Sequence, residues 1–266
     1  MFYRLSSHEL GLILFGVIVG ATALGLVLGR AVRHRSEHLR EPLGVLQAAL
    51  LGLVALVLAF GLSLAVGRYE SRRADLVEEA NAIGTTYLRA QTLAEPLRTR
   101  SLERLVRYTD TSIRLSDSVP GSAEARKAVA DGQLLQRELW QLAGQALADA
   151  PTASAPRLYV ETLNEMIDMQ TVQVSALNNR VPGAVLVFEV VAASIALGLL
   201  ALYLAMLARG VISVVLAAAF ISVLLLVTFD LDRPVRGLVR VPDTPLIDVR
   251  ESMEEPPAAR APSGPR

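Results

Sequence analysis

Four long apolar runs divide this chain, two near its start and two after a long polar stretch. They are Leu10–Gly29, Leu43–Gly67, Gly183–Ala208 and Val211–Phe229, and Glu189 is the only charged residue within them. A helix needs about 20 mostly apolar residues to cross the hydrocarbon core of a bilayer, and each run is long enough. The pattern predicts an all-α integral membrane protein with four transmembrane helices in two pairs.

The polar stretch between the two pairs predicts a helical bundle outside the membrane. Apolar residues recur there at three- and four-residue spacing, which is typical of amphipathic helices, and no strand-like alternation is present. We expect the second transmembrane helix to continue without a break to about Leu93. Three further helices are expected, one beginning at Pro96, one over Ala123–Asp149 and one over Arg157–Arg180.

These boundaries predict the domain organisation. Residues 1–67 form the first transmembrane pair, 68–181 the extramembrane insert, 182–229 the second pair and 230–266 a C-terminal segment with a Pro- and Ala-rich end that we expect to be disordered. The start of the chain has some signal-peptide character, but its apolar run continues to Gly29. We therefore expect an uncleaved transmembrane helix.

Small residues form a stripe along the first transmembrane helix. Glycine or alanine recurs close to every fourth position, at Gly16, Gly20, Ala21, Gly25 and Gly29. Such a stripe lets another helix approach closely, from the same or another subunit. The alternative is that glycine is simply more frequent in membrane helices.

Composition and charge narrow the function classes. The chain has 26 basic and 26 acidic residues, so nothing indicates a nucleic-acid partner. It has no cysteine, which excludes disulfides and thiolate chemistry. Phosphate-binding, dinucleotide-binding, zinc-protease and serine-hydrolase motifs are absent from the sequence. We predict that the protein is not an enzyme and that it has no cofactor.

Arginine placement bears on orientation, because positive charge favours the cytoplasmic side. With four transmembrane helices, both termini and the insert share one side, and that side carries more membrane-proximal arginines. The dense connector Arg30–Arg40 argues for the opposite orientation. Basic residues are almost all arginine, which fits a bacterial source. We predict a bacterial inner-membrane protein with insert and termini in the cytoplasm.

Two features stand out as candidate chemistry in or beside the membrane. Glu189 lies about two turns into the third apolar run, where an ionisable residue is a functional candidate that binds a cation, relays a proton or pairs with an arginine. The alternative is a solvated residue at the headgroup level. Glu78, Asn81, Thr85 and Arg89 share one face of the predicted second helix, with Glu79 pointing elsewhere. That face either lines an ion vestibule or forms polar pairs inside the bundle.

Two further clusters have simpler interpretations. Asp230 and Asp232 lie beside Arg233 at the end of the fourth apolar run, where local ion pairing is favoured over acid–base catalysis. His34 and His38 have the i,i+4 spacing of helical metal ligands, but no third strong ligand is nearby. We interpret their segment as a solvated connector and predict no metal site.

Three segments carry a family resemblance. They are EANAIGTTYLR at 79–89, LNEMID at 163–168 followed by Arg180-Val181-Pro182, and FDLDRP at 229–234 with Gly237. Together they resemble a bacterial bestrophin-like family, and the likeness covers most of the chain. Bestrophins are pentameric anion channels with four transmembrane helices and a cytosolic helical domain. The acidic run of the calcium clasp in animal bestrophins is absent, so the resemblance does not imply calcium gating.

Two hypotheses follow. The first is a non-enzymatic oligomeric membrane protein, an ion channel of the bestrophin type, with a pore lined by the second helix and a hydrophobic constriction at Leu51, Leu58 and Phe60. Its partners are the lipid bilayer, further copies of the chain and small ions. The candidate pore or polar-network residues are Glu78, Asn81, Thr85, Arg89, Arg180, Glu189, Asp230, Asp232 and Arg233. The second hypothesis is a membrane-anchored sensor or scaffold whose insert binds a partner or small ligand.

Overall fold

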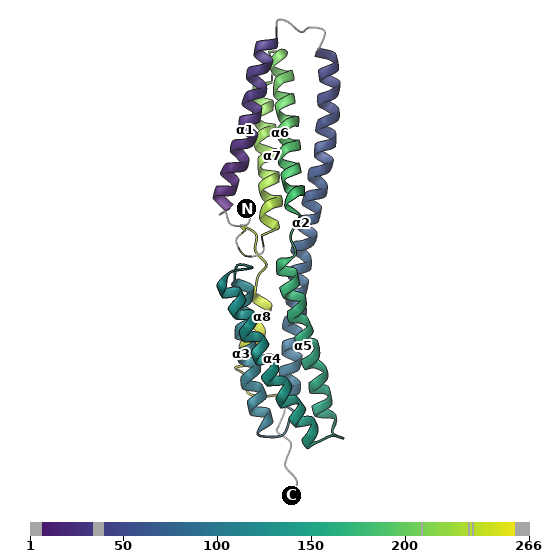
Figure 1. Ribbon diagram of the computed structural model, residues 1–266, viewed down its shortest axis with the longest axis vertical. Coiled ribbons are helices and arrows are strands. Elements are labelled where there is room, and N and C mark those ends of the chain that lie inside the picture. Colours follow the sequence, from purple (N-terminus) through teal and green to yellow (C-terminus); the bar gives the residue numbers. More distant parts are fainter. Residues whose placement is uncertain (1–6, 34–39, 209, 234, 236, 259–266) are drawn as a thin grey trace. The chain divides into compact units, whose positions relative to one another are not determined.

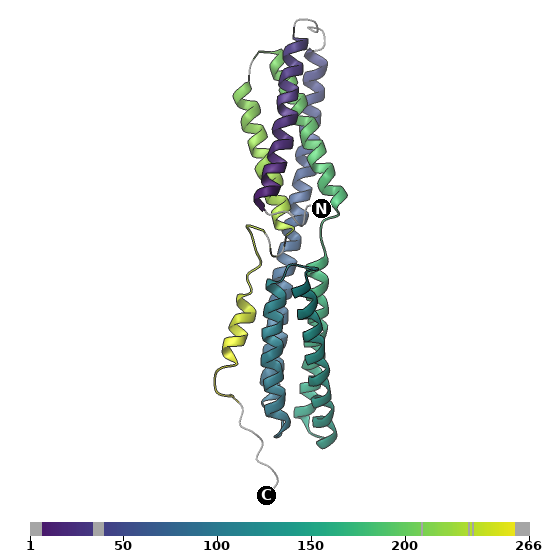
Figure 2. The same ribbon diagram turned by 60° about the vertical axis from the view of Figure 1, so that its left-hand side comes forward.

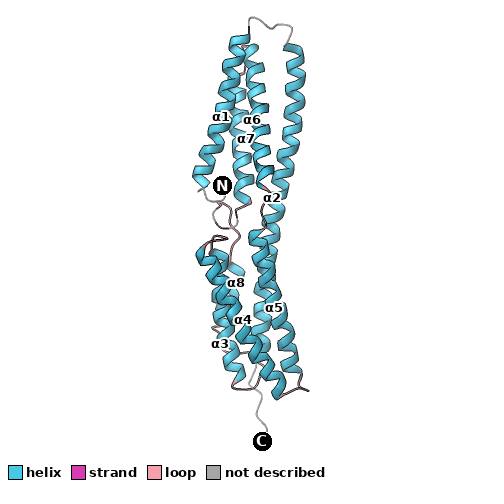
Figure 3. Ribbon diagram, viewed as in Figure 1, coloured by secondary structure: helices cyan, strands magenta, loops and turns pink. Residues whose placement is uncertain are grey.

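The structure is a computed structural model that describes residues 7–33, 40–208, 210–233, 235 and 237–258. Every regular element within these ranges is a helix (Figures 1 and 3). The helices are α1 Ser7–Val32, α2 Arg40–Ala90, α3 Leu97–Asp117, α4 Ala123–Asp149, α5 Ser154–Asn178, α6 Gly183–Met206, α7 Val211–Leu231 and α8 Thr244–Ser252.

The chain divides into two compact units, and α2 contributes to both. One unit, called the membrane unit below, consists of Met1–Tyr69 and Arg180–Arg240. The other, called the helical unit, consists of Glu70–Asn179 and Val241–Arg266. Within the described ranges, four helices are long and apolar enough to cross a membrane. The prediction of an all-α fold with four apolar helices is confirmed.

The membrane unit is built around α1, α6 and α7, which lie side by side (Figures 1 and 2). Its buried core contains Leu14, Ile18, Leu197, Leu225 and Phe229. Val54 and Leu58 of α2 belong to the same core. Large apolar side chains elsewhere on these helices are exposed, such as Leu216 of α7 at 66%. This pattern is that of helices whose outer surfaces face lipid or another subunit.

The glycine stripe of α1 has two distinct parts. A Cβ added at Gly25 would lie 2.9 Å from the Gly198 carbonyl carbon, and one at Gly29 would lie 2.7 Å from the Ala205 Cβ. A Cβ added at Gly16 or Gly20 would have no described atom within 4 Å. The prediction of close packing is therefore confirmed for Gly25 and Gly29, and the partner is α6 of the same chain.

The helical unit packs α3, α4, α5, α8 and the second half of α2 around one apolar core. Its fully buried side chains include Ile83, Leu105, Tyr108, Leu139, Tyr159, Leu163 and Met166. The α3–α4 turn lies between Asp117 and Ala123. Gly121 adopts a left-handed φ of 81°. The Ser122 side chain accepts a hydrogen bond from the Ala125 N–H at 3.0 Å and caps α4.

Helix α8 is not predicted by the sequence pattern, and it anchors the C-terminal segment to the helical unit. Leu246 is fully buried, and the Tyr87 hydroxyl donates to the Met253 carbonyl oxygen at 3.1 Å. The Arg250 guanidinium donates to Asp110 of α3 at 2.7 Å. The Pro- and Ala-rich tail predicted to be disordered lies largely outside the described residues, which end at 258.

Candidate functional site

Glu189 is buried inside the membrane unit. It is 1% exposed, and neither carboxylate oxygen has a hydrogen-bond partner among the described residues. Its carboxyl group lies directly against Gly61 of α2. A Cβ added at position 61 would lie 2.6 Å from the Glu189 Cδ. The side chain turns inward between α6 and α2 and is not solvated within the chain, which argues against the alternative of a solvated residue; its depth in the bilayer stays a prediction.

Asp232 connects three segments of the membrane unit. It is fully buried, and its two oxygens accept the Val181 backbone N–H at 3.0 and 3.1 Å. The same carboxylate lies 3.9 Å from the Arg68 guanidinium of α2. The segment that leads into α6 is thereby tied to the end of α7 and to α2. Asp232 is therefore paired with an arginine of α2, and the local pairing expected beside Arg233 stays a prediction.

Asp230 holds the chain that follows α7. Its Oδ2 accepts the Val239 N–H at 2.9 Å, and the Asp230 side chain is 2% exposed. A Cβ at Gly237 would lie 2.9 Å from the same oxygen, so glycine is needed there. Arg233 is also buried, and Arg180 is half-buried. Asp230 and Asp232 both accept backbone N–H groups, and Asp232 also approaches Arg68, an arrangement that holds chain segments together.

The polar face predicted on α2 is divided by the structure. Glu78, Asn81 and Thr85 are exposed within the chain. Arg89 donates to the Leu158 carbonyl oxygen of α5 at 2.8 Å and pairs with Glu161 at 3.5 Å. Arg89 therefore pairs with α5 at the surface of the bundle, and the interpretation as polar pairing inside the bundle is wrong for the other three.

The predicted hydrophobic constriction is also divided. Leu58 is 3% exposed and belongs to the core of the membrane unit, whereas Phe60 is 61% exposed. Two residues along an α-helix correspond to about 200°, so these side chains point to nearly opposite sides. Leu51 is half-buried against the same core. Leu58 cannot face a pore while it packs inside its own subunit, and that part of the prediction is wrong.

Glu79 is a buried acidic residue that is not among the predicted site residues. It is fully buried in the helical unit, whereas its neighbour Glu78 is exposed. Burial raises the pKa of Glu79 to about 8, and the Ser112 hydroxyl opposes that rise. The burial of Glu79 is indicated by its spacing in the sequence, because Glu79 follows Leu76 by three residues and precedes Ile83 by four. It therefore shares the apolar face of the helix.

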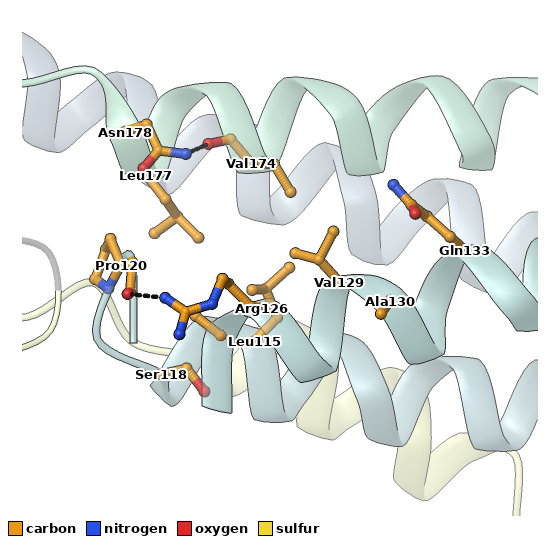
Figure 4. Close-up of a pocket in the computed structure, with 12 residues that line it drawn as sticks. Leu115, Ser118, Pro120, Arg126, Val129, Ala130, Gln133, Val174, Leu177 and Asn178 are labelled. Carbon is orange, nitrogen blue, oxygen red and sulfur yellow. Dashed lines mark hydrogen bonds between the residues drawn. The ribbon is translucent and has the colours of Figure 1, made fainter. Parts of the chain in front are cut away.

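The helical unit also has a surface pocket at the α3–α4 turn and the end of α5. Its volume is about 430 Å³, within the usual range for small-molecule sites. Leu115, Val129, Val174 and Leu177 line its apolar wall (Figure 4). The Arg126 guanidinium donates to the Gly121 carbonyl oxygen at 2.7 Å beside it.

Within the described part of the chain, no group of three or more His, Asp or Glu side chains is arranged to hold a metal ion. His34 and His38 lie outside the described residues.

Comparison with known proteins identifies the family. The model of the bestrophin-like domain matches residues 14–246, which is most of the chain. The chain therefore belongs to the bestrophin-like family and is a membrane protein. No curated protein matches the sequence.

Solved structures agree with this assignment at the level of the fold. Two mutant forms of a bacterial bestrophin homolog from Klebsiella pneumoniae superpose with TM-scores of 0.63 and 0.61. They are 18% and 14% identical to this chain, and each match covers 89% of it. The matches cover 94% and 97% of the homolog chains. At these identities the likeness shows the fold alone, and the resemblance seen in the sequence is confirmed.

Proposed function

We propose that this protein is an oligomeric, bestrophin-like ion channel of the bacterial inner membrane. The observation that carries the proposal is the family match over residues 14–246, in a chain with four helices able to cross a membrane. The family is known for channels rather than for enzymes. The paired arrangement of the transmembrane helices and the cytoplasmic side for insert and termini belong to the same proposal.

The ion pathway is lined by the exposed face of α2 in the membrane unit. Leu46, Leu53, Phe60 and Leu64 are between 50% and 61% exposed, so the described residues of the chain leave this face uncovered. Their spacings of seven and four residues place them on one side of the helix. Copies of α2 around a symmetry axis would turn these side chains into rings, and rings of large apolar side chains gate by excluding water.

Glu78, Asn81 and Thr85 supply the polar surface of an aqueous vestibule in the helical unit. They are exposed and lie on one side of α2. In a symmetric oligomer each becomes a ring, and a ring of glutamates attracts cations. Selectivity thus depends on Glu78 in this proposal.

Glu189 acts on the pathway from behind α2. Its carboxyl group touches Gly61 of that helix and is buried between helices. An ionisable group inside a membrane protein is costly and is usually retained for a function. We assign it a positioning role, in which its contact with Gly61 sets where the pore-facing side of α2 lies. Asp230, Asp232, Arg233 and Arg180 support the membrane boundary in this scheme.

The pathway is tested by ion flux from liposomes that contain purified variants. Phe60→Ser should raise the flux severalfold because a polar side chain weakens a hydrophobic gate. Leu216→Ser is the matched control, since Leu216 is similarly exposed but lies on α7. Equal effects of the two substitutions would contradict the assignment of α2 as the pore helix.

The pocket beside Arg126 favours a second candidate function, a membrane-anchored sensor whose insert binds a small ligand. Its apolar wall and adjacent guanidinium suit an amphipathic monoanion, and sodium octanoate is a suitable probe. Binding that is lost in Val174→Trp, which fills the pocket, and in Arg126→Gln would support this function. Absence of binding at millimolar octanoate would reject it.

A further inference from the structure

Glu79 poses a physical problem in the interior of the helical unit. The side chain is fully buried, and neither carboxylate oxygen has a well-formed hydrogen bond. No ion pair to it is formed by the described residues. An ionised carboxylate without a partner is among the most unfavourable groups to bury, so the charge must be paired or removed.

The surroundings of Glu79 are polar but uncharged. Two residues of α3 lie close to the Glu79 carboxyl group. The Ser112 hydroxyl lowers the pKa of Glu79, and the charge of Glu79 raises the pKa of Tyr108. Gln136 of α4 donates to the Tyr108 hydroxyl at 3.4 Å and to the Gln170 side-chain oxygen of α5 at 2.8 Å. Helices α2, α3, α4 and α5 thus contribute to one buried polar layer.

The backbone of α4 is shaped to admit this layer. A Cβ at position 132 would lie 3.4 Å from the Gln170 Cδ and still closer to its Nε2, so glycine makes room for the amide. The Ser112 hydroxyl and the Gln170 amide nitrogen are buried with no hydrogen-bond partner in the structure. The layer therefore has an unpaired hydroxyl group at Ser112, which lies close to the Glu79 carboxyl group, and an unpaired amide nitrogen at Gln170.

Charged groups near the layer do not neutralise Glu79. On α2 itself, the exposed Glu78 is also acidic. The pKa of Asp75 is raised mainly by burial and to a lesser extent by the negative charge of Glu78. On α8, Arg250 is engaged by Asp110 at 2.7 Å and by Glu254 at 3.1 Å. On α3 the titratable neighbour is Tyr108, and burial raises its pKa, so the phenol stays neutral. Toward the layer, α4 and α5 present the neutral amides of Gln136 and Gln170.

We propose that Glu79 is a proton-binding site of the helical unit, and that loss of its proton loosens the packing of α2 against α3. A neutral carboxyl group can donate to the Ser112 oxygen and accept from a neighbouring donor. The neutral group thereby meets the hydrogen-bonding needs of the polar layer without placing a charge in the interior. The assignment is independent of ion conduction and applies whether or not the protein is a channel.

The pH range follows from the two states of the chain. Burial raises the pKa of Glu79 from 4.5 to about 8 in the folded unit. Because the folded pKa is the higher one, the stabilisation is fully present below pH 4.5 and is lost as the pH rises to about 8. Between these values the folded unit holds one proton that the unfolded chain has released. The unfolding constant then rises up to about tenfold per pH unit and levels off at higher pH.

Thermal unfolding of the purified full-length protein between pH 5 and 9 tests the proposal. Trp140 of α4 is the only tryptophan, so its fluorescence reports on the helical unit. Measurements in choline chloride remove small inorganic cations. The wild-type midpoint should fall as the pH rises to about 8. Glu79→Gln keeps the shape of the neutral acid and should remove that part of the pH dependence, whereas Glu78→Gln, at the exposed neighbour, should keep it.

Two results would overturn the assignment. One is a Glu79→Gln protein with the same pH dependence as the wild type. The other is a loss of stability at high pH that sodium or potassium chloride reverses and choline chloride does not, which would make Glu79 a cation site. If Glu79→Gln does not fold, carbon-13 NMR of labelled glutamates in a Glu189→Gln protein, which lacks the other buried glutamate, gives the answer. One carboxyl group must titrate near pH 8 in that protein, and the absence of such a group would refute the proposal.

Discussion

The Glu189 carboxyl group of α6 lies against the Cα of Gly61 in α2, in a space that no other residue type could share with it. This contact gives a buried acidic side chain and a small residue a common explanation. It also joins α2, the helix that we assign to the ion pathway, to the core of the membrane unit.

The contact predicts a strong coupling between positions 61 and 189. Gly61→Ala should destabilise the protein, because the new Cβ would lie 2.6 Å from the Glu189 Cδ. Overpacking of this kind costs about 1–3 kcal/mol. In a Glu189→Ala background the same substitution should cost little. Gly52→Ala is the matched control in α2, since a Cβ there meets nothing within 4 Å. Thermal midpoints in detergent provide the measurement, and additive effects would refute the coupling.

The divided glycine stripe of α1 gives a second prediction. Gly25→Leu should lower the yield and the thermal midpoint, because its side chain would collide with the backbone of α6 at Gly198. Gly20→Leu, five residues earlier at a position with no described atom within 4 Å of an added Cβ, should leave the fold of the subunit intact. If Gly20→Leu instead dissociates the oligomer while the monomer stays folded, that part of the stripe packs between subunits. Equal tolerance of both substitutions would contradict the α1–α6 packing.

Asp232 should be essential to the membrane boundary. Asp232→Ala removes the acceptor for the Val181 N–H and the partner of Arg68. Breaking a buried network of this kind costs about 3–5 kcal/mol. Asp232→Asn keeps an oxygen for Val181 and should lose less. Exposed Glu165 in α5 provides a control, and Glu165→Ala should be silent. If the alanine variants at 165 and 232 were equally stable, this view of Asp232 would be wrong.

Orientation is open to a direct test. We predict that a reporter active only in the cytoplasm will be active both after Arg266 and when inserted at Gly121. Opposite signals from the two sites would contradict four transmembrane helices. A periplasm-specific reporter that is active at both sites would keep the helices and reverse the orientation.

Much of the fold could be predicted from the sequence because its signals are long and periodic. The apolar runs identify the membrane helices, and the turn at Gly121 and the uninterrupted α2 follow from local preferences. The short helix α8 was missed because one residue, Leu246, is buried within it. Its attachment depends on contacts with Tyr87 and Asp110, which are far away in the sequence.

The candidate site was harder to predict, because burial of a polar residue depends on which face of a helix is covered. Glu78 and Glu79 are adjacent and chemically identical, yet only Glu79 is buried. Leu58 and Phe60 are both suited to a hydrophobic gate, but Leu58 belongs to the core of its own subunit. The identity of Asp232 as a partner of Val181 and Arg68 likewise required the tertiary structure.

The most direct test of the central claim is ion flux from liposomes that contain the purified wild-type protein. The mass of the detergent-solubilised protein is measured on the same preparation and gives its oligomeric state. The channel assignment predicts an oligomer and a flux well above that of empty liposomes. A stable, correctly sized oligomer that conducts neither cations nor anions would contradict it.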